Sequence, residues 1–395
     1  MSENPVMQVA PSDAPFPSVE LNRCPFPFYD ERREATPIEQ VPGGYRIYRH
    51  EDIAFVLQNE DWFSAYIPGN QTSKGIDWEG AVHIGADDGD RHDQNRKLLS
   101  RPFTPKRLKT YEPMIEQHSD HLIDRFIDRG SVEFAGEFAD RLPAMVISDM
   151  LGLPVEGEEL EFLRTWNAAF TSGQPAPEEF TRMHDHILAN LTERRENPRD
   201  DVMSELIERQ VERDGEYDPG LCSTLAIEMI SGGVITTGEL ITSAMMLLIQ
   251  HPDEMAAVRA DYGRIIPMLE ETLRLEAPVQ FRQRVAQVDV EVAGVEIPAG
   301  SMVWLMLQSG SRDDGTFECP ADFKVGRENI KRHFGFGLGL HFCVGAPLAR
   351  LEGRIAFERL LSRVQDIRFA PGNDFRNIDS PVFRMPQRLE IEFEA

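Results

Sequence analysis

The chain has 395 residues, of which 41% are apolar, so it is long enough to bury a sizeable core in one large domain. Its net charge of −26 favours solubility and argues against nucleic acid as a partner. The first twenty residues contain no apolar run, and no later stretch looks long and uncharged enough to span a bilayer, so we expect a cytoplasmic protein without membrane contact.

The first half of the chain predicts an irregular start followed by helices. Residues 1–45 are rich in proline, and residues 45–58 predict a short strand followed by a helix. From about residue 105 to residue 260, apolar residues recur at three- and four-residue spacing, which is typical of helices that pack on a core. Asp200 or Asp201 is suited to cap one of these helices.

The second half predicts one long helix and a small β part. The longest apolar helix is expected from Leu221 to Gln250, ended by the sequence His251-Pro252. Residues 288–307 alternate between apolar and polar and turn at glycines, which predicts a small sheet. Residues 344–364 have the pattern of an amphipathic helix, and the last segment alternates again.

A glycine-rich loop around Cys343 is the sharpest signal for function. Glycine lets a chain lie close to a flat ligand, and the helix expected after the loop places free N–H groups near the thiol. Both features favour a thiolate that can bind haem iron. The alternative is a buried structural cysteine, which we retain for Cys24, Cys222 and Cys319 because their spacing suggests neither zinc nor a disulfide framework.

The same loop matches the pattern F-G-x-G-x-H-x-C-x-G at Phe336, Gly337, Gly339, His341, Cys343 and Gly345. This pattern is the haem-binding signature of the cytochrome P-450 family. From about residue 25 to residue 393 the chain resembles that family, and especially soluble bacterial members such as those that hydroxylate camphor-like terpenoids. The resemblance implies a single mostly α domain over residues 1–395, shaped as a triangular prism with a small β region, an irregular segment at 1–24, and haem b bound through Cys343.

By resemblance, a Glu-x-x-Arg pair supports the cysteine loop. Glu271 and Arg274 lie at the family's distance before the cysteine, and Arg327 matches the third partner. The resemblance implies a buried charged cluster with a structural role. The alternative is an exposed salt bridge on one helix face, which such spacing often produces.

The resemblance also assigns partners to the two haem carboxylates. His92 and Arg96 share a helix face, Arg284 stands where the chain enters the sheet, and His341 is in the cysteine loop. Each of them alone has the alternative of a solvated charge.

The long helix carries the segment that crosses the haem in the family. Gly232, Gly233, Thr236 and Thr237 match it, and the hydroxyl of Thr236 would hydrogen-bond O2 or its water. The alternative for Thr236 is a bond to the carbonyl four residues back. Ile235 occupies the position of the family's usual acid, so protons would have to come by Thr236, by ordered water or from another acid such as Glu228.

Substrate and partner contacts follow from the resemblance alone. Besides residues 66–86 and Thr237, the substrate-facing candidates, each of which could instead be core, are Met229, Ile230, Val234, Val279, Gln280, Phe281, Val382 and Phe383. An iron–sulfur ferredoxin with its NAD(P)H-dependent reductase would dock on the cysteine side. The candidate docking cations, which could instead be scattered surface charge, are Lys97, Arg101, Lys106, Arg107, Lys109, Lys331 and Arg332.

The function expected is a haem-thiolate monooxygenase that hydroxylates or dealkylates a small hydrophobic substrate with O2 and ferredoxin electrons. A terpenoid or an aromatic is the first expectation for the substrate, with a fatty acid or a macrolide-like compound as alternatives. Ile235 favours a second hypothesis, a peroxide-using or isomerising haem-thiolate enzyme. A non-catalytic haem sensor is the third, for which the sequence offers no signalling segment.

Overall fold

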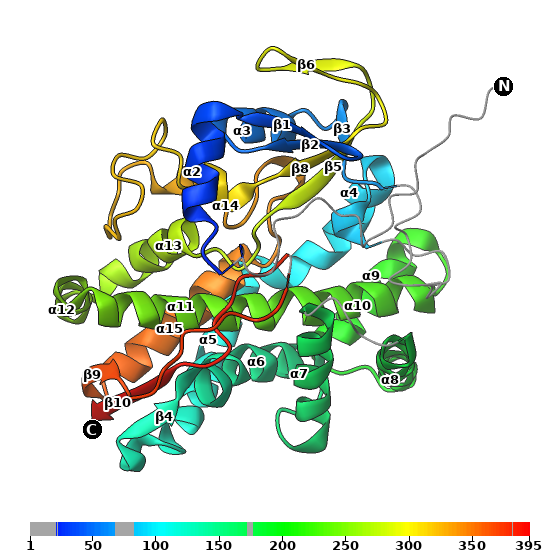
Figure 1. The fold of residues 1–395 in the computed structure, drawn as a ribbon. Coiled ribbons are helices and arrows are strands. Elements are labelled where there is room, and N and C mark those ends of the chain that lie inside the picture. The colour runs from blue at the N-terminus through cyan, green and yellow to red at the C-terminus, as the bar shows by residue number, and fades with distance from the viewer. Residues whose placement is uncertain (1–20, 22, 68–82, 172–176, 381) are drawn as a thin grey trace.

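The longest apolar segment forms the central axis of the molecule. In the computed structural model, which describes residues 21, 23–67, 83–171, 177–380 and 382–395, α10 (Pro219–Gly233) and α11 (Ile235–Gln250) run end to end across the middle (Figure 1). The sequence predicted one helix here, whereas the structure interrupts it at Val234. The hydroxyl of Thr236 donates to the carbonyl oxygen of Gly232 at 2.7 Å, and a side chain that takes a helix carbonyl in this way favours a local bend.

This same segment is the single one among the described residues that is long and apolar enough, by length and composition, to cross a membrane. The expectation that no stretch passes this test was therefore wrong: the most apolar 18-residue window within residues 219–250 has a mean hydropathy of 1.5. However, 67% of the most apolar window is buried inside the molecule, and the core helix of a soluble protein passes the same test.

Helices pack around this axis, as the three- and four-residue spacing predicted. They are α4 (Gly89–Ser100), α5 (Pro105–Asp124), α6 (Arg141–Leu151), α7 (Gly157–Thr171), α8 (Pro177–Glu196), α9 (Val202–Asp214), α12 (Pro252–Ala260), α13 (Ile265–Leu275) and α15 (Ala346–Leu361). Asp201 is the cap of α9, because its side chain accepts a hydrogen bond from the backbone N–H of Ser204.

A five-stranded sheet lies on one side of α10 and α11, opposite α6 and α7 (Figure 1). Its order is β1 (Ile38–Val41), β2 (Gly44–Ile47), β8 (Met302–Leu305), β5 (Arg282–Ala286) and β3 (Phe63–Ser64). The helices α3 (His50–Gln58) and α14 (Leu307–Gly310) connect to it. The remaining strands are β4 (Ser131–Glu133), β9 (Gln365–Phe369) and β10 (Glu390–Glu394) in one small sheet, and β6 (Val290–Val292) with β7 (Val295–Ile297) in another.

The start of the chain is more regular than its proline content predicted. α2 (Phe26–Ala35) and β1 both lie within residues 1–45. Tertiary contacts stabilise them, because β1 pairs with β2 and the buried Arg33 donates to the carbonyl oxygen of Ser309 at 3.1 Å. The prediction of a mostly α fold with a small β region is confirmed.

Candidate active site

The cysteine loop is a tight connection that ends at a helix. Cys343 lies three residues before Ala346, the first residue of α15, and its backbone N–H donates to the carbonyl oxygen of Phe336 at 2.9 Å. Gly337 and Gly339 have φ of +73° and +75°, which glycine adopts without strain. A Cβ on Gly339 would also lie 2.3 Å from the carbonyl oxygen of Leu57, so this position accepts glycine alone.

The thiol of Cys343 faces an internal space. Its side chain is accessible in the chain, yet burial among the surrounding protein atoms raises the pKa of the thiol, as expected for a group at the wall of an internal space. The N–H groups of Gly345 and Ala346 act to lower this pKa, as do Arg282 and Arg96, but they do not offset burial. The N–H groups at the start of α15 thus act in the expected direction, toward a thiolate, while burial acts against them.

The end of α10 near Gly232 also faces a space that no protein atom fills. Gly232 is exposed although it lies near the centre of the fold, and a Cβ built on it would meet nothing within 4 Å. Gly233 has a different environment, because a Cβ there would lie 2.8 Å from Cδ1 of Ile147 on α6. Gly233 therefore permits helix packing, whereas Gly232 leaves room for a ligand.

Thr236 makes the contact that the sequence had left as an alternative. Its hydroxyl donates to the carbonyl oxygen of Gly232, so its single proton is already used and its lone pairs remain able to accept. Thr237 is buried beside it, and Ile235 is half-buried against the main core.

Two histidines expected at the haem carboxylates lie together. The rings of His92 and His341 are 4.7 Å apart between centroids. Nε2 of His92 is buried without a hydrogen-bond partner, and Nε2 of His341 lies 3.1 Å from Oδ1 of Asp88. Arg96 instead donates from Nη2 to the carbonyl oxygen of Phe342 at 2.6 Å, which connects α4 to the cysteine loop.

Strand β5 contributes two arginines, of which the sequence predicted only one. Arg282 and Arg284 are two residues apart, so they share a face of the strand, and this alternation could have revealed Arg282. Burial lowers the pKa of both guanidinium groups, that of Arg284 to about 10, and Arg282 lies close enough to Cys343 to interact with it electrostatically. Among the described residues, neither forms an ion pair with a carboxylate.

These observations test whether the residues fit an iron porphyrin with two carboxylates. A thiol faces an internal space, Gly232 leaves open volume, and an orphaned histidine nitrogen lies near two arginines that lack anionic partners. A flat ligand with two carboxylates and a metal ion would bind the thiolate through the metal, fill the volume at Gly232, and accept hydrogen bonds from the histidine and the arginines. The residues fit, and the arrangement defines a candidate haem-thiolate site.

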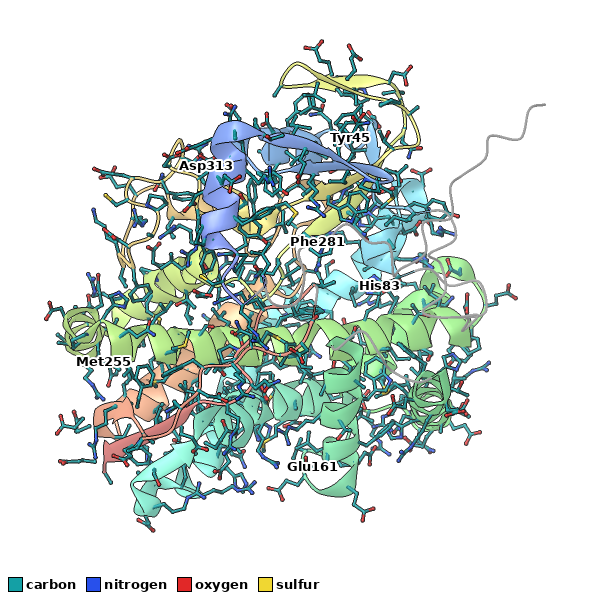
Figure 2. All side chains as sticks on the ribbon, viewed as in Figure 1. Tyr45, His83, Glu161, Met255, Phe281 and Asp313 are labelled. Carbon is teal, nitrogen blue, oxygen red and sulfur yellow. The ribbon has the colours of Figure 1, made fainter. Side chains whose placement is uncertain are left out.

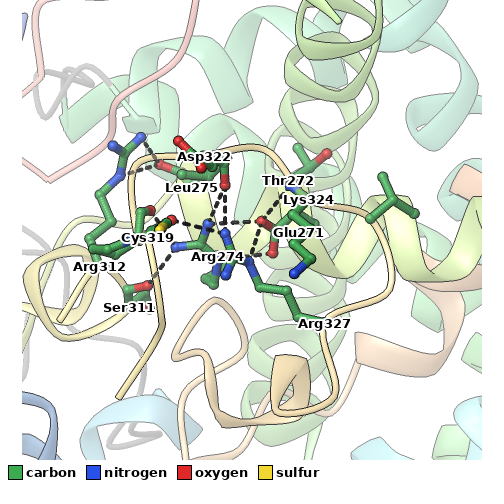
Figure 3. Close-up of polar contacts among 12 residues, drawn as sticks. Glu271, Thr272, Arg274, Leu275, Ser311, Arg312, Cys319, Asp322, Lys324 and Arg327 are labelled. Carbon is green, nitrogen blue, oxygen red and sulfur yellow. Dashed lines mark hydrogen bonds and ion pairs between the residues drawn. The ribbon is translucent and has the colours of Figure 1, made fainter. Parts of the chain in front are cut away.

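The Glu-x-x-Arg pair lies in a buried network with Arg327 (Figure 3). The carboxylate of Glu271 accepts from Nε and Nη2 of Arg274 at 2.9 and 2.8 Å and from Nε of Arg327 at 2.8 Å. The two arginines also donate to backbone carbonyls of residues 311–322, for example to Pro320 at 2.7 Å. The network therefore anchors the segment before the cysteine loop, rather than the loop itself.

The neighbouring Glu270 contacts the loop, and the sequence analysis missed it. Its carboxylate accepts from Nε of Arg350 at 2.6 Å and lies 3.0 Å from Nε2 of His333. Arg350 also covers the ring of Phe336 at 4.5 Å. Burial acts to raise the pKa of Glu270, but His333 and Arg350 lower it to about 2. Consecutive acids on α13 thus hold different segments, which a single motif does not reveal.

The substrate-facing candidates separate into two groups. Val279, Val382 and Phe383 are half-buried and adjoin one another, because Val279 and Phe383 form a β-bridge. Phe281 was expected to face the substrate, but its ring packs in an apolar cluster with Tyr29 and Trp304. Of the segment 66–86, residues 68–82 lie outside the described part of the chain.

The remaining candidates are buried. Met229, Ile230 and Val234 lie in the main core, and Ile230 is fully enclosed there. Gln280 is also buried, with its Nε2 donating to the carbonyl oxygen of Ala277 at 2.8 Å.

The candidate docking cations are partly neutralised. Arg101 lies 3.6 Å from Glu205, and Arg107 lies 3.6 Å from Glu205 and 3.8 Å from Asp200. In contrast, Lys97, Lys106 and Lys109 are exposed. The free charge is thus smaller than the sequence suggested.

Comparison with known proteins gives the family. Residues 174–393 match the family model described as "Cytochrome P450". The chain is 32% identical over 390 residues to cytochrome P-450 109 of Bacillus spizizenii, covering 93% of this chain and 92% of that protein. It is 32% identical to cyclomarin C epoxidase CymV of Salinispora arenicola over 397 residues, covering 96% and 98%.

Solved structures agree with these relatives. Cytochrome P-450 CYP109Q5 from Chondromyces apiculatus superposes with a TM-score of 0.86 and 31% identity, covering 95% of this chain and 97% of that one. The chain belongs to the cytochrome P-450 family. It is accordingly a haem-thiolate monooxygenase, and its cofactor is haem b.

Proposed function

We propose that this monooxygenase binds haem through Cys343 and inserts oxygen into a small, mostly apolar substrate, using electrons from a ferredoxin and its NAD(P)H-dependent reductase. The single observation that carries the proposal is the thiol of Cys343, accessible and yet enclosed by protein, three residues before the start of α15. Haem bound there supplies the activation of O2.

The residues around the thiol would orient the cofactor. Arg282 and Arg284 from β5, and His92 with His341 beside them, offer donors for the two carboxylates. Arg96 holds the carbonyl of Phe342, so it fixes the backbone next to the proposed ligand. Gly232 leaves the space over the cofactor open.

Thr236 and Ile235 define how protons can be handled. Because the proton of Thr236 goes to the carbonyl of Gly232, its oxygen is free to accept a hydrogen bond from a water and so to hold that water near Gly232. Ile235 has no group that can relay a proton. On the same helices, Glu239 accepts from the hydroxyl of Ser243. Oε1 of Glu228 accepts from the N–H of Ile84, which leaves only its Oε2 without a partner.

The apolar nature of the substrate is supported by the half-buried Val279, Val382 and Phe383. One relative, at 32% identity, is an epoxidase whose name specifies cyclomarin C. We favour a terpenoid or an aromatic, since the described residues of these segments are mostly hydrophobic.

Reconstituted turnover tests the proposal. The haem-loaded protein is screened with small terpenoids and aromatics by the change in haem absorption on binding, and the ligands that bind are incubated with NADH, reductase and ferredoxin or with hydrogen peroxide. Oxygenated product that depends on the ferredoxin supports the proposal. Product formed with peroxide and none with ferredoxin supports the second candidate, which Ile235 favours.

A further inference from the structure

A buried acid on α10 lacks a partner for one of its two oxygens. Glu228 has a side chain that is 5% exposed, and its Oε1 accepts from the backbone N–H of Ile84 at 2.7 Å. Oε2 is buried without a hydrogen-bond partner. Because an unpaired buried oxygen is costly, this carboxyl is expected to have a partner that the protein alone does not supply.

The position of Glu228 points to the space above the haem. Glu228 and Gly232 are four residues apart on α10, so they share a helix face and lie about 6 Å apart along the axis. Gly232 opens onto empty volume on that face. Glu228 therefore lies about one helical turn from the open volume at Gly232, on the same face of α10.

His83, which is labelled in Figure 2, lies beside Glu228. Its side chain is 56% exposed in the chain, yet burial, with Arg282 and His341, lowers its pKa to about 4. Nδ1 accepts from the N–H of Gly85 at 2.9 Å, so a neutral ring carries its proton on Nε2. Nδ1 lies 3.9 Å from Oε1 of Glu228, and since both atoms accept, His83 does not satisfy that carboxyl.

The carboxyl group of Glu228 can donate a hydrogen bond to an oxygen atom of a ligand, which the apolar core cannot accept. Burial, together with the charge of Asp87, raises the pKa of Glu228 to about 8, although the hydrogen bond from Ile84 acts to lower it. With Oε1 engaged by Ile84, the proton of the neutral acid resides on Oε2 and can be donated. A hydroxyl or a carbonyl oxygen accepts such a bond, and a hydrocarbon does not.

We propose that the substrate carries a hydroxyl or carbonyl oxygen that hydrogen-bonds to Oε2 of Glu228, with its apolar body extending toward Gly232 and the haem. This inference rests on the proposed function, since it requires an apolar substrate in the same cavity. It narrows the substrate class to oxygenated alicyclic or aromatic compounds, and excludes plain hydrocarbons as the preferred ligands.

Matched ligands and variants test the inference on the haem-loaded protein. The ligands are an alicyclic ten-carbon hydrocarbon and the ketone and alcohol on the same skeleton. Dissociation constants come from the haem absorption change and from calorimetry. The variants are Glu228→Gln, in which the amide can still accept from Ile84 and donate to a ligand oxygen, and Glu228→Leu, with Glu228→Met as a second apolar replacement. Glu239→Gln is the control, because it replaces another buried acid on the same axis.

The affinity ratio of an oxygenated ligand over the hydrocarbon is expected to fall about tenfold in Glu228→Leu and Glu228→Met, which corresponds to one hydrogen bond to a buried acid. The ratio should change less than about twofold in Glu228→Gln and Glu239→Gln. Equal ratios in wild type and in both apolar variants overturn the inference and leave the proposed function standing. If no ligand of either kind binds the wild type, the apolar-substrate proposal fails together with it.

Discussion

Arg350 and Glu270 form a two-point contact between α15 and α13, 80 residues apart in the chain. Nε of Arg350 donates to Oε1 of Glu270 at 2.6 Å, and Nη2 donates to Oε2 at 3.1 Å. His333, just before the cysteine loop, approaches the same carboxylate. Glu270 thus holds both ends of the loop that contains Cys343.

Glu270→Gln is expected to destabilise the fold and weaken haem retention, because it removes the charge that both partners bind. The pKa of Glu270 is lowered from 4.5 to about 2, so its contribution is present above about pH 4.5 and is lost as the pH falls toward 2. Urea unfolding should show a difference of roughly 3 kcal/mol between wild type and variant at pH 7, shrinking on acidification. A difference that stays constant down to pH 3 would contradict this assignment.

Glu271→Ala should cost roughly 3–5 kcal/mol of unfolding free energy, because it leaves two buried arginines without their carboxylate. The matched control is Glu161→Ala. Glu161 has the same spacing to Arg164, at 2.7 Å, but its side chain is 47% exposed, so its loss should cost at most about 1 kcal/mol. Similar melting temperatures and haem contents for the two variants would contradict the claim that the buried Glu-x-x-Arg pair stabilises the fold more than the exposed one.

Reduction by an acidic ferredoxin should slow as salt rises, since electrostatic attraction is screened. The ion pairs in the structure predict which cations contribute most to this attraction. Lys106→Glu should slow reduction more than Arg107→Glu, because Glu205 and Asp200 already offset the charge of Arg107. Stopped-flow reduction rates measure both, with Arg129→Glu as an exposed control outside these segments. Rates that are independent of salt and equal in all three variants would remove the docking argument.

Ile235→Asp should raise the product formed per NADH consumed and change the solvent isotope effect, because it restores an ionisable group next to Thr236. Ile235→Asn is the control of the same shape that cannot ionise. The alternative is that Ile235 only shapes the pocket. That alternative holds if the Asp and Asn variants are alike in coupling and isotope effect with the true substrate.

Periodicity predicted the helical majority, the small sheet and the position of Cys343 before a helix, because these depend on local spacing. The start of the chain was mispredicted, because α2 and β1 are stabilised by contacts with residues such as Ser309, far away in sequence. The break at Val234 is accompanied by the hydrogen bond from the hydroxyl of Thr236 to the carbonyl oxygen of Gly232, and the spacing of apolar residues does not determine where that hydroxyl points.

The candidate site was predictable where a motif covers it. The motif named Glu271 but not Glu270, and Arg284 but not Arg282, although each missed residue adjoins or alternates with a named one. Their roles depend on which chain segments pack opposite, such as His333 and Arg350 against Glu270. Likewise, the sequence does not distinguish the surroundings of Gly232 from those of Gly233. In the structure, Ile147 packs against Gly233, whereas the space beside Gly232 is open.

The central claim is that the thiol of Cys343 binds the haem iron, and the absorption spectrum of the reduced, CO-bound protein tests it most directly. The account predicts the red-shifted band typical of thiolate ligation in the wild type, and its loss in Cys343→His under conditions where haem is still retained. Cys222→Ala, which changes a buried cysteine away from the loop, should keep the band. A Cys343→His protein that retained the red-shifted band would contradict the account.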